Sequence, residues 1–301
     1  MPEIPEIEAT RLVVAKELVG KKVKGIALTN GKTAGRHKTA KDFRALVEGR
    51  SIKSVSRLGR TLILSLDNGG AWVLDPGPLG LLLKSQGAKD VKPKHTAAVM
   101  SFSAGNDWWL IDPRGEAEMF ASEKPSEGTS VTMNKFVDKL ALSDDGKALR
   151  RAVPELASWG IDLTLDQIGW DRLGVILQVA KAPLKSVLSD SRYLCGLSSV
   201  VIDEALFVAG VRATRPSDEV SSIEVRRLHR ALIEVLSEAI KFSGTTVEPE
   251  NWTDPNGTKG GYQEFLAVVG RVGAPCTQCR DRVIEEVTSE WTTALCPSCQ
   301  V

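Results

Sequence analysis

Four cysteines near the end of the chain constrain its fold more than any other feature. They form two C-x2-C pairs, Cys276 with Cys279 and Cys296 with Cys299, and sixteen residues separate the pairs. Each pair can bind a metal ion from one tight turn, and four thiolates complete the tetrahedral ligand set of a structural zinc site. We therefore expect one zinc ion that holds a small hairpin and takes no part in chemistry. The alternative is four cysteines that are free or disulfide-bonded.

The length and charge of the chain bound its domain count and its partners. A chain of 301 residues suggests about two domains. The formal net charge is only +1, but residues 1–150 carry 24 basic and 18 acidic side chains, whereas residues 151–301 carry 15 and 20. The first half is therefore expected to be the better binder of a polyanion.

The sequence favours a cytosolic protein with no membrane partner. No apolar run reaches transmembrane length, and the first residues are acidic, unlike those of a signal peptide. In a reducing compartment, clustered cysteines indicate a metal site rather than disulfides. The fifth cysteine, Cys195, is expected to be a small buried apolar side chain rather than a nucleophile.

Hydrophobic spacing predicts an α+β protein. Helical spacing occurs at residues 6–20, 41–50 and 221–240, and β-like runs occur at 22–28, 51–57, 61–66, 71–75 and 108–112. We expect residues 1–130 to form a sandwich of antiparallel strands with a leading helix. The expected parts that follow are a linker with the start of a helical domain at 131–164, the main helical domain at 165–262 and a zinc-finger hairpin at 263–301.

The chain opens with MPEIPEIEAT, and this stretch has two interpretations. Proline and carboxylates suit the first turn of a helix, so it could be a helix start with capping charges. The other interpretation is chemical. If Met1 is removed, Pro2 becomes a secondary amine that titrates at about pH 8 and can attack an aldehyde carbon. Glu3 could then donate or accept a proton beside that carbon, and Glu6 would lie on the same helix face.

The whole chain resembles the formamidopyrimidine-DNA glycosylase and endonuclease VIII family in three motifs that occur in the family's order. The family begins with Pro-Glu-Leu-Pro-Glu-Val-Glu after Met removal, and the matching residues here are Pro2, Glu3, Pro5, Glu6 and Glu8. Residues 181–216 look like the family's helix–two-turn–helix region, and the cysteine spacing with the closing CPSCQ looks like its zinc finger. The resemblance implies that residues 165–262 form a DNA-binding domain.

The resemblance implies a bifunctional base-excision repair enzyme, a DNA glycosylase and AP lyase that flips a damaged nucleotide out of the duplex. In such an enzyme the N-terminal proline attacks the sugar C1′, displaces the damaged base and forms a Schiff base. Elimination then nicks the strand. Carried over to this chain, Pro2 is the nucleophile and Glu3 is the proton donor and acceptor at the sugar. Glu6 is a supporting carboxylate in the lesion pocket.

The resemblance also implies contacts with DNA. Arg60 stands where the family has a phosphate-contacting lysine, and Arg114 is kept in the sequence DPRGE. Lys185 and Arg271 match basic positions that face the DNA backbone. Ser199 stands where the family has an asparagine that grips the phosphate backbone at the lesion.

Other positions depart from the family pattern. Asp75 replaces a phosphate-facing histidine, and Trp291 replaces the zinc-finger arginine that clamps the phosphates flanking the lesion. Pro78 replaces the methionine that fills the hole left by the flipped base, and Glu116 replaces an aromatic wedge. Each lost phosphate contact is expected to weaken binding and to lower the salt slope by about 0.9. Trp291 could instead stack on an exposed base or simply pack on the finger.

Two functional hypotheses follow. The first is a divergent DNA glycosylase and AP lyase, a cytoplasmic, nucleoid-associated monomer. Loss of the wedge would favour damaged or abasic DNA that is already unstacked, including single strands and bubbles. The second is a non-catalytic nucleic-acid- or protein-binding member that kept the fold. A conventional enzyme for oxidised purines is a third interpretation, which the missing lesion-handling residues do not favour.

Overall fold

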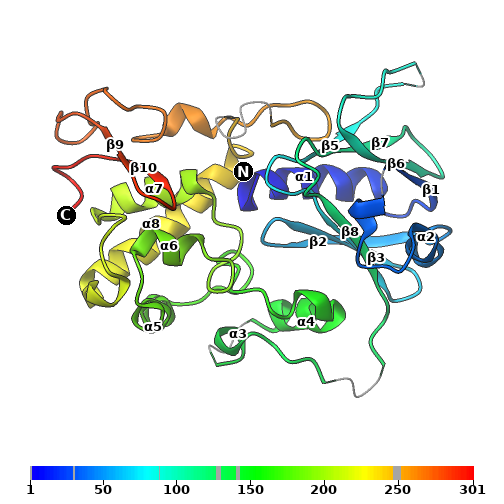
Figure 1. Ribbon diagram of the computed structural model, residues 1–301, viewed down its shortest axis with the longest axis horizontal. Helices are drawn as coiled ribbons and strands as arrows, with labels where there is room; N and C mark the ends of the chain where they lie inside the picture. The colour runs from blue at the N-terminus through cyan, green and yellow to red at the C-terminus, as the bar shows by residue number, and fades with distance from the viewer. Residues whose placement is uncertain (1, 30, 88, 127–129, 140–142, 247–251) are drawn as a thin grey trace. The chain divides into compact units, whose positions relative to one another are not determined.

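The computed structural model describes residues 2–29, 31–87, 89–126, 130–139, 143–246 and 252–301 (Figure 1). Residue contacts divide the chain into two compact units. The first unit comprises residues 1–131, 148–157 and 243–260, and the second comprises residues 132–147, 158–242 and 261–301. The expected boundaries at residues 130, 164 and 262 follow chain order, and the functional division that they describe stays a prediction.

The first unit is built on two antiparallel sheets of four strands each. One sheet has the strand order β1-β6-β7-β5 and the other has the order β2-β3-β4-β8. The strands are β1 (Val23–Leu28), β2 (Ile52–Leu58), β3 (Thr61–Leu66), β4 (Ala71–Asp75), β5 (Leu81–Lys84), β6 (Thr96–Phe102), β7 (Trp108–Ile111) and β8 (Glu118–Ser122).

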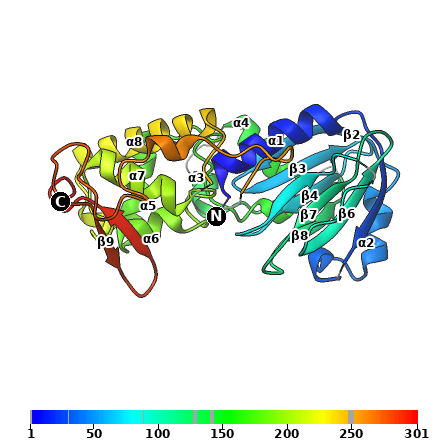
Figure 2. The ribbon, with the colours of Figure 1, turned by 90° about the horizontal axis from the view of Figure 1, so that it is seen from above.

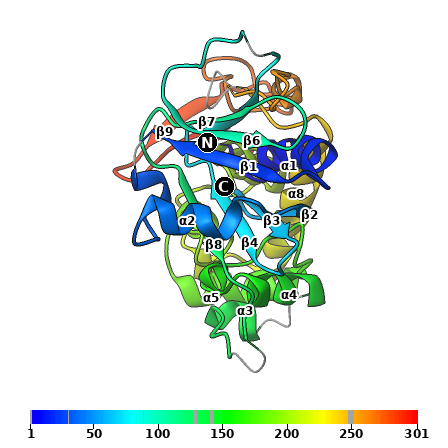
Figure 3. The same cartoon turned by 90° about the vertical axis from the view of Figure 1, so that its right-hand side faces the viewer.

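Side chains from both sheets meet in one hydrophobic core. Met100 and Leu110 of one sheet belong to the same buried cluster as Leu64 and Trp72 of the other. Figure 3 shows the two sheets as separate layers. The predicted β-sandwich, and with it the α+β class, is confirmed.

Helix α1 (Ile4–Leu18) contacts β2 and β3 and contributes Ile7, Val14 and Leu18 to the core. Helix α2 (Ala40–Val47) begins after Thr39, whose hydroxyl accepts the N–H of Asp42 as an N-cap. The short 3-10 helices η1 (Gly31–Ala34) and η2 (Pro154–Leu156) complete the regular structure described for this unit. Because α1 packs on the sandwich, the residues just before it are held at a fixed place on the unit.

The second unit is mostly helical and ends in a two-stranded hairpin. Its elements are α3 (Lys135–Lys139), α5 (Trp170–Ala180), α6 (Leu184–Ser189), α7 (Ser199–Ala209), η3 (Ser217–Glu219), α8 (Ser222–Lys241), η4 (Tyr262–Phe265), β9 (Ile284–Val287) and β10 (Thr292–Leu295). Helix α4 (Asp144–Ala152) spans residues assigned to both units.

Helix α7 is the centre of this unit. It contacts α6, α8 and β10, and α8 also contacts α5 (Figure 2). Nine of its eleven residues are buried, including two carboxylates. Helix α8 confirms the helical spacing predicted at residues 221–240. Leu228 and Leu232 on its apolar face are fully buried, whereas Ile223 in its first turn is 71% exposed. Among the helices of the described residues, none is long and apolar enough to cross a membrane.

Candidate active site and metal centre

The N-terminal residues Pro2, Glu3 and Glu6 are all buried in the first unit. Helix α1 begins at Ile4 with a proline in its first turn, so Glu3 immediately precedes the helix. The expected removal of Met1 concerns a residue outside the described part of the chain. The structure therefore brings the three candidate catalytic residues together, and their roles stay predictions.

Both carboxylate oxygens of Glu6 accept peptide N–H groups. Oε2 accepts from Glu3 at 3.0 Å, and Oε1 accepts from Thr245 at 2.8 Å. Burial raises the pKa of Glu6, and these two N–H groups oppose the shift because they favour the ionised form. Glu6 therefore fastens the start of the chain to Thr245, a residue 239 positions away in the sequence.

Gly244, beside Thr245, is shaped by the same contact. Its φ is +77°, and a Cβ built there would lie 2.4 Å from Oε1 of Glu6. A side chain at this position would therefore collide with the carboxylate and strain the backbone. Sequence analysis missed Gly244 and Thr245, because no spacing within residues 244–261 points back to the N-terminus.

Glu3 has the electrostatics of a group that can exchange a proton at neutral pH. Burial raises its pKa to about 7, although the nearby Arg60 guanidinium lowers it. A carboxyl group with a pKa near the working pH can act as an acid or as a base.

Arg60 lies between two carboxylates. Its Nε is 3.0 Å from Oδ1 and 3.1 Å from Oδ2 of Asp75, and its guanidinium reaches within 3.8 Å of Oε1 of Glu3. Two departures from the family pattern, at residues 60 and 75, therefore meet in one ion pair. Sequence analysis treated them separately and missed the pair.

Arg114 and Glu116 lie on an exposed loop of the first unit. Asp112 holds this loop, because its carboxylate accepts the N–H groups of Gly115, Glu116 and Ala117 at 2.8 to 3.1 Å. Arg114 and Glu116 both point into solvent, so both are accessible to a ligand. Pro78, by contrast, is buried.

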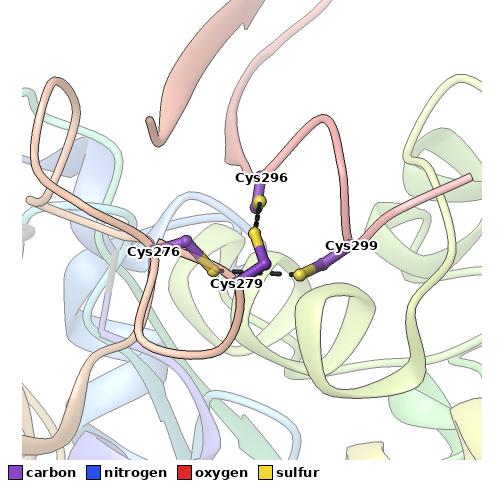
Figure 4. A group of neighbouring side chains, drawn as sticks. All are labelled: Cys276, Cys279, Cys296 and Cys299. Carbon is purple, nitrogen blue, oxygen red and sulfur yellow. Dashed lines mark hydrogen bonds between the residues drawn. The ribbon is translucent and has the colours of Figure 1, made fainter. Parts of the chain in front are cut away.

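The four cysteines of the second unit form one cluster (Figure 4). Their sulfur atoms all lie within 4.8 Å of one another, with Sγ–Sγ distances of 3.8 Å between Cys276 and Cys299 and 3.5 Å between Cys279 and Cys296. Tetrahedral zinc has Zn–S bonds of about 2.3 Å, which places its sulfurs about 3.8 Å apart. The geometry and the thiolate donor set fit a four-coordinate metal ion.

Backbone and packing hold the cysteine turns in place. The N–H of Gln278 donates to Sγ of Cys276 at 3.4 Å, and the side chain of Gln300 accepts the N–H of Cys296 at 3.0 Å. Cys276 and Cys296 also belong to a small hydrophobic cluster with Phe207 of α7. The turns are therefore fixed by α7 as well as by the hairpin.

Two adjacent carboxylates of α7 fasten the C-terminal segments, and sequence analysis missed both. Glu204 accepts the N–H groups of residues 267, 268 and 269 at 2.8 to 3.0 Å. Asp203 accepts Nζ of Lys185 and the hydroxyl of Thr293, both at 2.6 Å. Burial raises the pKa of both carboxyl groups, and the hydrogen bonds they accept favour the ionised forms.

Lys185 and Trp291 lie together in the second unit. Lys185 is buried, and its Nζ also lies 2.7 Å from the carbonyl oxygen of Thr292, so the ammonium group makes internal contacts. This geometry does not favour the expected DNA-backbone contact by Lys185. The indole N–H of Trp291 donates to Oγ of Ser186 at 2.9 Å, which holds the half-buried ring against α6. Base stacking by Trp291 stays a prediction.

Ser199 and Arg271 are half-buried. Ser199 is the first residue of α7, after Ser198, whose hydroxyl accepts the N–H of Val201 at 3.1 Å. A helix N-terminus favours an anion, so this position suits a phosphate. Arg271 donates to the carbonyl oxygen of Pro275 at 3.3 Å, and Pro275 directly precedes Cys276 of the cluster.

Two family models match this chain. The model of the formamidopyrimidine-DNA glycosylase N-terminal domain matches residues 1–119, and that of the formamidopyrimidine-DNA glycosylase H2TH domain matches residues 160–250. A formamidopyrimidine-DNA glycosylase of Thermus thermophilus is 30% identical over 302 aligned residues, which cover 100% of this chain and 98% of that protein. A formamidopyrimidine-DNA glycosylase of Pelotomaculum thermopropionicum is 27% identical over an alignment that covers 100% of this chain and 99% of that protein.

Solved structures agree. The crystal structure of the MutM (Fpg) protein from Thermus thermophilus superposes with a TM-score of 0.82 at 29% identity, covering 99% of this chain and 98% of the other. A complex between Lactococcus lactis Fpg and DNA containing an abasic site gives a TM-score of 0.80 at 20% identity over 99% of both chains, a likeness of fold.

Proposed function

Because this chain belongs to the formamidopyrimidine-DNA glycosylase family, we propose that it is a base-excision repair enzyme, a bifunctional DNA glycosylase and AP lyase. The observation that carries the proposal is the buried Pro2-Glu3 start, in which Glu3 has a pKa of about 7. The alternative of a non-catalytic binding member is less well supported, since the similarity to formamidopyrimidine-DNA glycosylases extends over the whole chain.

The proposed reaction uses the amine of Pro2 after Met1 is removed. The amine attacks C1′ of the damaged nucleotide, and the bond from C1′ to the base breaks. The C1′–O4′ bond of the sugar ring then opens, O4′ takes up a proton while the proline nitrogen loses its own, and an iminium forms between proline and C1′. The iminium withdraws electrons, so a proton can leave C2′ while the C3′–O bond breaks and the 3′ phosphate departs. The strand is then nicked, and hydrolysis of the iminium releases the enzyme.

Glu3 is proposed as the proton donor and acceptor at the sugar, because its pKa of about 7 keeps both protonation states populated at neutral pH. Glu6 is proposed as a supporting carboxylate. Its two peptide contacts, with Glu3 and Thr245, would fix the position of the nucleophile rather than carry protons.

We propose that DNA is bound through exposed Arg114, through Arg60 and Arg271, and through Ser199 at the start of α7. Trp291 would add a stacking surface for an unpaired base. Exposed Glu116 offers no wedge to fill the duplex, so we propose that the enzyme prefers lesions that are already unstacked: abasic sites, single strands and bubbles.

The cysteine cluster is proposed to hold one zinc ion. A four-thiolate site has no open position, so the ion would stabilise the finger and take no part in the reaction. Metal analysis of the purified protein should find one zinc per chain, and chelation should loosen residues 267–301 in hydrogen exchange. We further propose a monomer that works on DNA in the cytoplasm, at the nucleoid.

Single-turnover borohydride trapping on abasic DNA tests the function. Borohydride reduces the iminium to a stable amine, so wild type with a confirmed Pro2 terminus should form a covalent adduct. Pro2→Gly should reduce the adduct sharply, and Glu3→Gln should slow its formation by about 100-fold or more. Glu285→Gln, at an exposed carboxylate of β9, is the control and should behave as wild type.

The substrate arm compares single-stranded, bubble and duplex abasic DNA. Faster trapping on unpaired substrates is expected from the missing wedge. A wild-type protein that has lost Met1 and forms no adduct on any substrate would contradict the lyase function and favour the binding member.

A further inference from the structure

The ion pair of Arg60 and Asp75 is built into the sheet beside Glu3. Asp75 ends β4, Arg60 stands directly before β3, and β3 pairs with β4 through Leu62 opposite Leu74. Adjacent antiparallel strands bring the two side chains to the same end of the sheet. The pair is therefore positioned by backbone pairing rather than by two mobile surface side chains.

Further contacts fix Asp75 from its other side. The N–H of Gly77 donates to Oδ1 of Asp75 at 2.8 Å, and the Asp75 side chain is only 13% exposed. Arg60 uses its Nε for Asp75, which leaves a terminal nitrogen 3.8 Å from Glu3. A carboxylate thus holds the guanidinium in the orientation that faces Glu3.

The charged groups that face Glu3 come from three elements. Arg60 lies directly before β3, Asp75 lies at the end of β4, and Glu6 lies on α1. Burial raises the pKa of Glu3. The positive charge of Arg60 lowers this pKa, whereas the negative charges of Asp75 and Glu6 raise it. Without Asp75, the positive charge of Arg60 would act on Glu3 more strongly, because among the other described carboxylates that act on Arg60 only Glu116 would be left to offset it.

We propose that Asp75 is a positioning residue of the active site: it holds the Arg60 guanidinium beside Glu3 and offsets its charge, so that Glu3 can carry a proton during the reaction. This inference rests on the proposed function for its catalytic meaning. Because Arg60 is already paired with Asp75, a DNA phosphate that binds Arg60 has to compete with the Asp75 carboxylate.

The test is a direct titration of Glu3 by carbon NMR of protein labelled at glutamate carboxyl carbons, with the Glu3 signal identified by its absence in Glu3→Gln. In wild type the midpoint should lie at about 7. In Asp75→Asn it should fall by about 1 or more, because the free Arg60 cation favours the ionised form. In Arg60→Gln it should rise, and in Asp75→Glu it should return towards wild type.

The matched control is a second arginine–carboxylate pair of the same exposure. Arg215 and Glu224 are 27% and 14% exposed, against 30% and 13% for Arg60 and Asp75. Glu224→Gln breaks that pair in the other unit and should leave the Glu3 midpoint unchanged. The opposite directions expected for Asp75→Asn and Arg60→Gln separate the proposal from general loosening, which would move both midpoints the same way.

A Glu3 midpoint that stays the same in Asp75→Asn, or that moves the same way in both variants, overturns the inference. If Asp75→Asn does not fold, Arg60→Gln and Asp75→Glu decide by the same criterion. The titration needs no activity, so it is separate from the proposed function: absence of any borohydride adduct in wild type refutes the lyase, whatever Glu3 does. When the adduct forms, the pH dependence of its rate should shift with the Glu3 midpoint in each variant.

Discussion

At the scale of single residues, the buried carboxyl group of Glu3 makes stability depend on pH. Its pKa rises from 4.5 to about 7 on folding, so between these values the folded state binds more protons than the unfolded state. The contribution of Glu3 is therefore most favourable below about pH 4.5 and is lost as pH rises through 7.

Glu3→Gln removes this titration. Its free energy of unfolding relative to wild type should rise between pH 5 and pH 8, by about 2–3 kcal/mol. Urea unfolding of both proteins at several pH values measures the difference in their free energies of unfolding. The contributions of the other carboxyl groups are the same in both proteins and cancel in this difference. A difference that stays constant with pH would refute the assignment of a raised pKa to Glu3.

Gly244 supports a second prediction at this scale. Gly244→Ala places a Cβ 2.4 Å from the Glu6 carboxylate at a φ of +77°. Gly257→Ala is the control, because its φ is +86° and nothing lies within 4 Å of the added carbon. Both should lose about 1 kcal/mol to backbone strain. Only Gly244→Ala should lose more and also slow trapping, because it displaces Glu6. Equal effects in thermal unfolding and trapping would show that the contact with Glu6 carries no weight.

At the scale of elements, the sequence predicted what lies in local patterns. The strands at 61–66 and 71–75 were found at their observed bounds, because each is mostly apolar and the turn residues DNGG separate the two. Strand β6 (Thr96–Phe102) was missed, since Ala97 and Ala98 dilute its β-branched character. The four-cysteine cluster was predicted because two C-x2-C pairs are themselves the sequence signature of a four-thiolate metal site.

The candidate site divides in the same way. Pro2, Glu3 and Glu6 could be named because they belong to one motif. Their partners could not, because Thr245 reaches Glu6 and Asp75 reaches Glu3 only through tertiary contacts. The same holds for Asp203, whose bond to Thr293 joins residues 90 positions apart.

Contacts of Lys185 and Asp203 join α6, α7 and β10, and they support a prediction about stability. Lys185 and Asp203 form a buried ion pair, with side chains 1% and 5% exposed. Lys185→Met leaves Asp203 as a buried charge without its ammonium partner, which should cost about 3–5 kcal/mol at pH 8. The loss should shrink at pH 5, because a protonated Asp203 no longer needs a cation.

The control for this variant is Lys241→Met. Lys241 and Glu238 form an ion pair on α8 with side chains 65% and 52% exposed, so its loss should change stability by no more than about 0.5 kcal/mol. Urea unfolding of both variants at the two pH values makes the comparison. Losses of similar size would mean that the buried pair contributes no more than a surface pair.

At the scale of the whole molecule, charge decides how tightly a polyanion is held. The chain is nearly neutral, and its basic excess lies in residues 1–150 while residues 151–301 are acidic overall. Arg60 is partly neutralised by Asp75, and Lys185 by Asp203. Two of the four basic residues that the family resemblance places towards DNA are therefore paired with carboxylates, and we expect a shallower dependence of the binding constant on salt than four free phosphate contacts would give.

Trp291→Arg tests this argument, because it restores a positive charge at the position where the family resemblance places a phosphate clamp. The variant should steepen the slope of log K against log salt by about 0.9 on duplex abasic DNA and should bind more tightly at low salt. Val287→Arg, at a 69% exposed position of β9 in the same hairpin, adds the same charge opposite Thr292 rather than at the position of the clamp, and should change the slope less. Fluorescence anisotropy over a salt series measures both. Equal slopes for the two variants would mean that residue 291 does not face a phosphate. The indole of Trp291, which is hydrogen-bonded to Ser186, would then serve to pack the hairpin on α6.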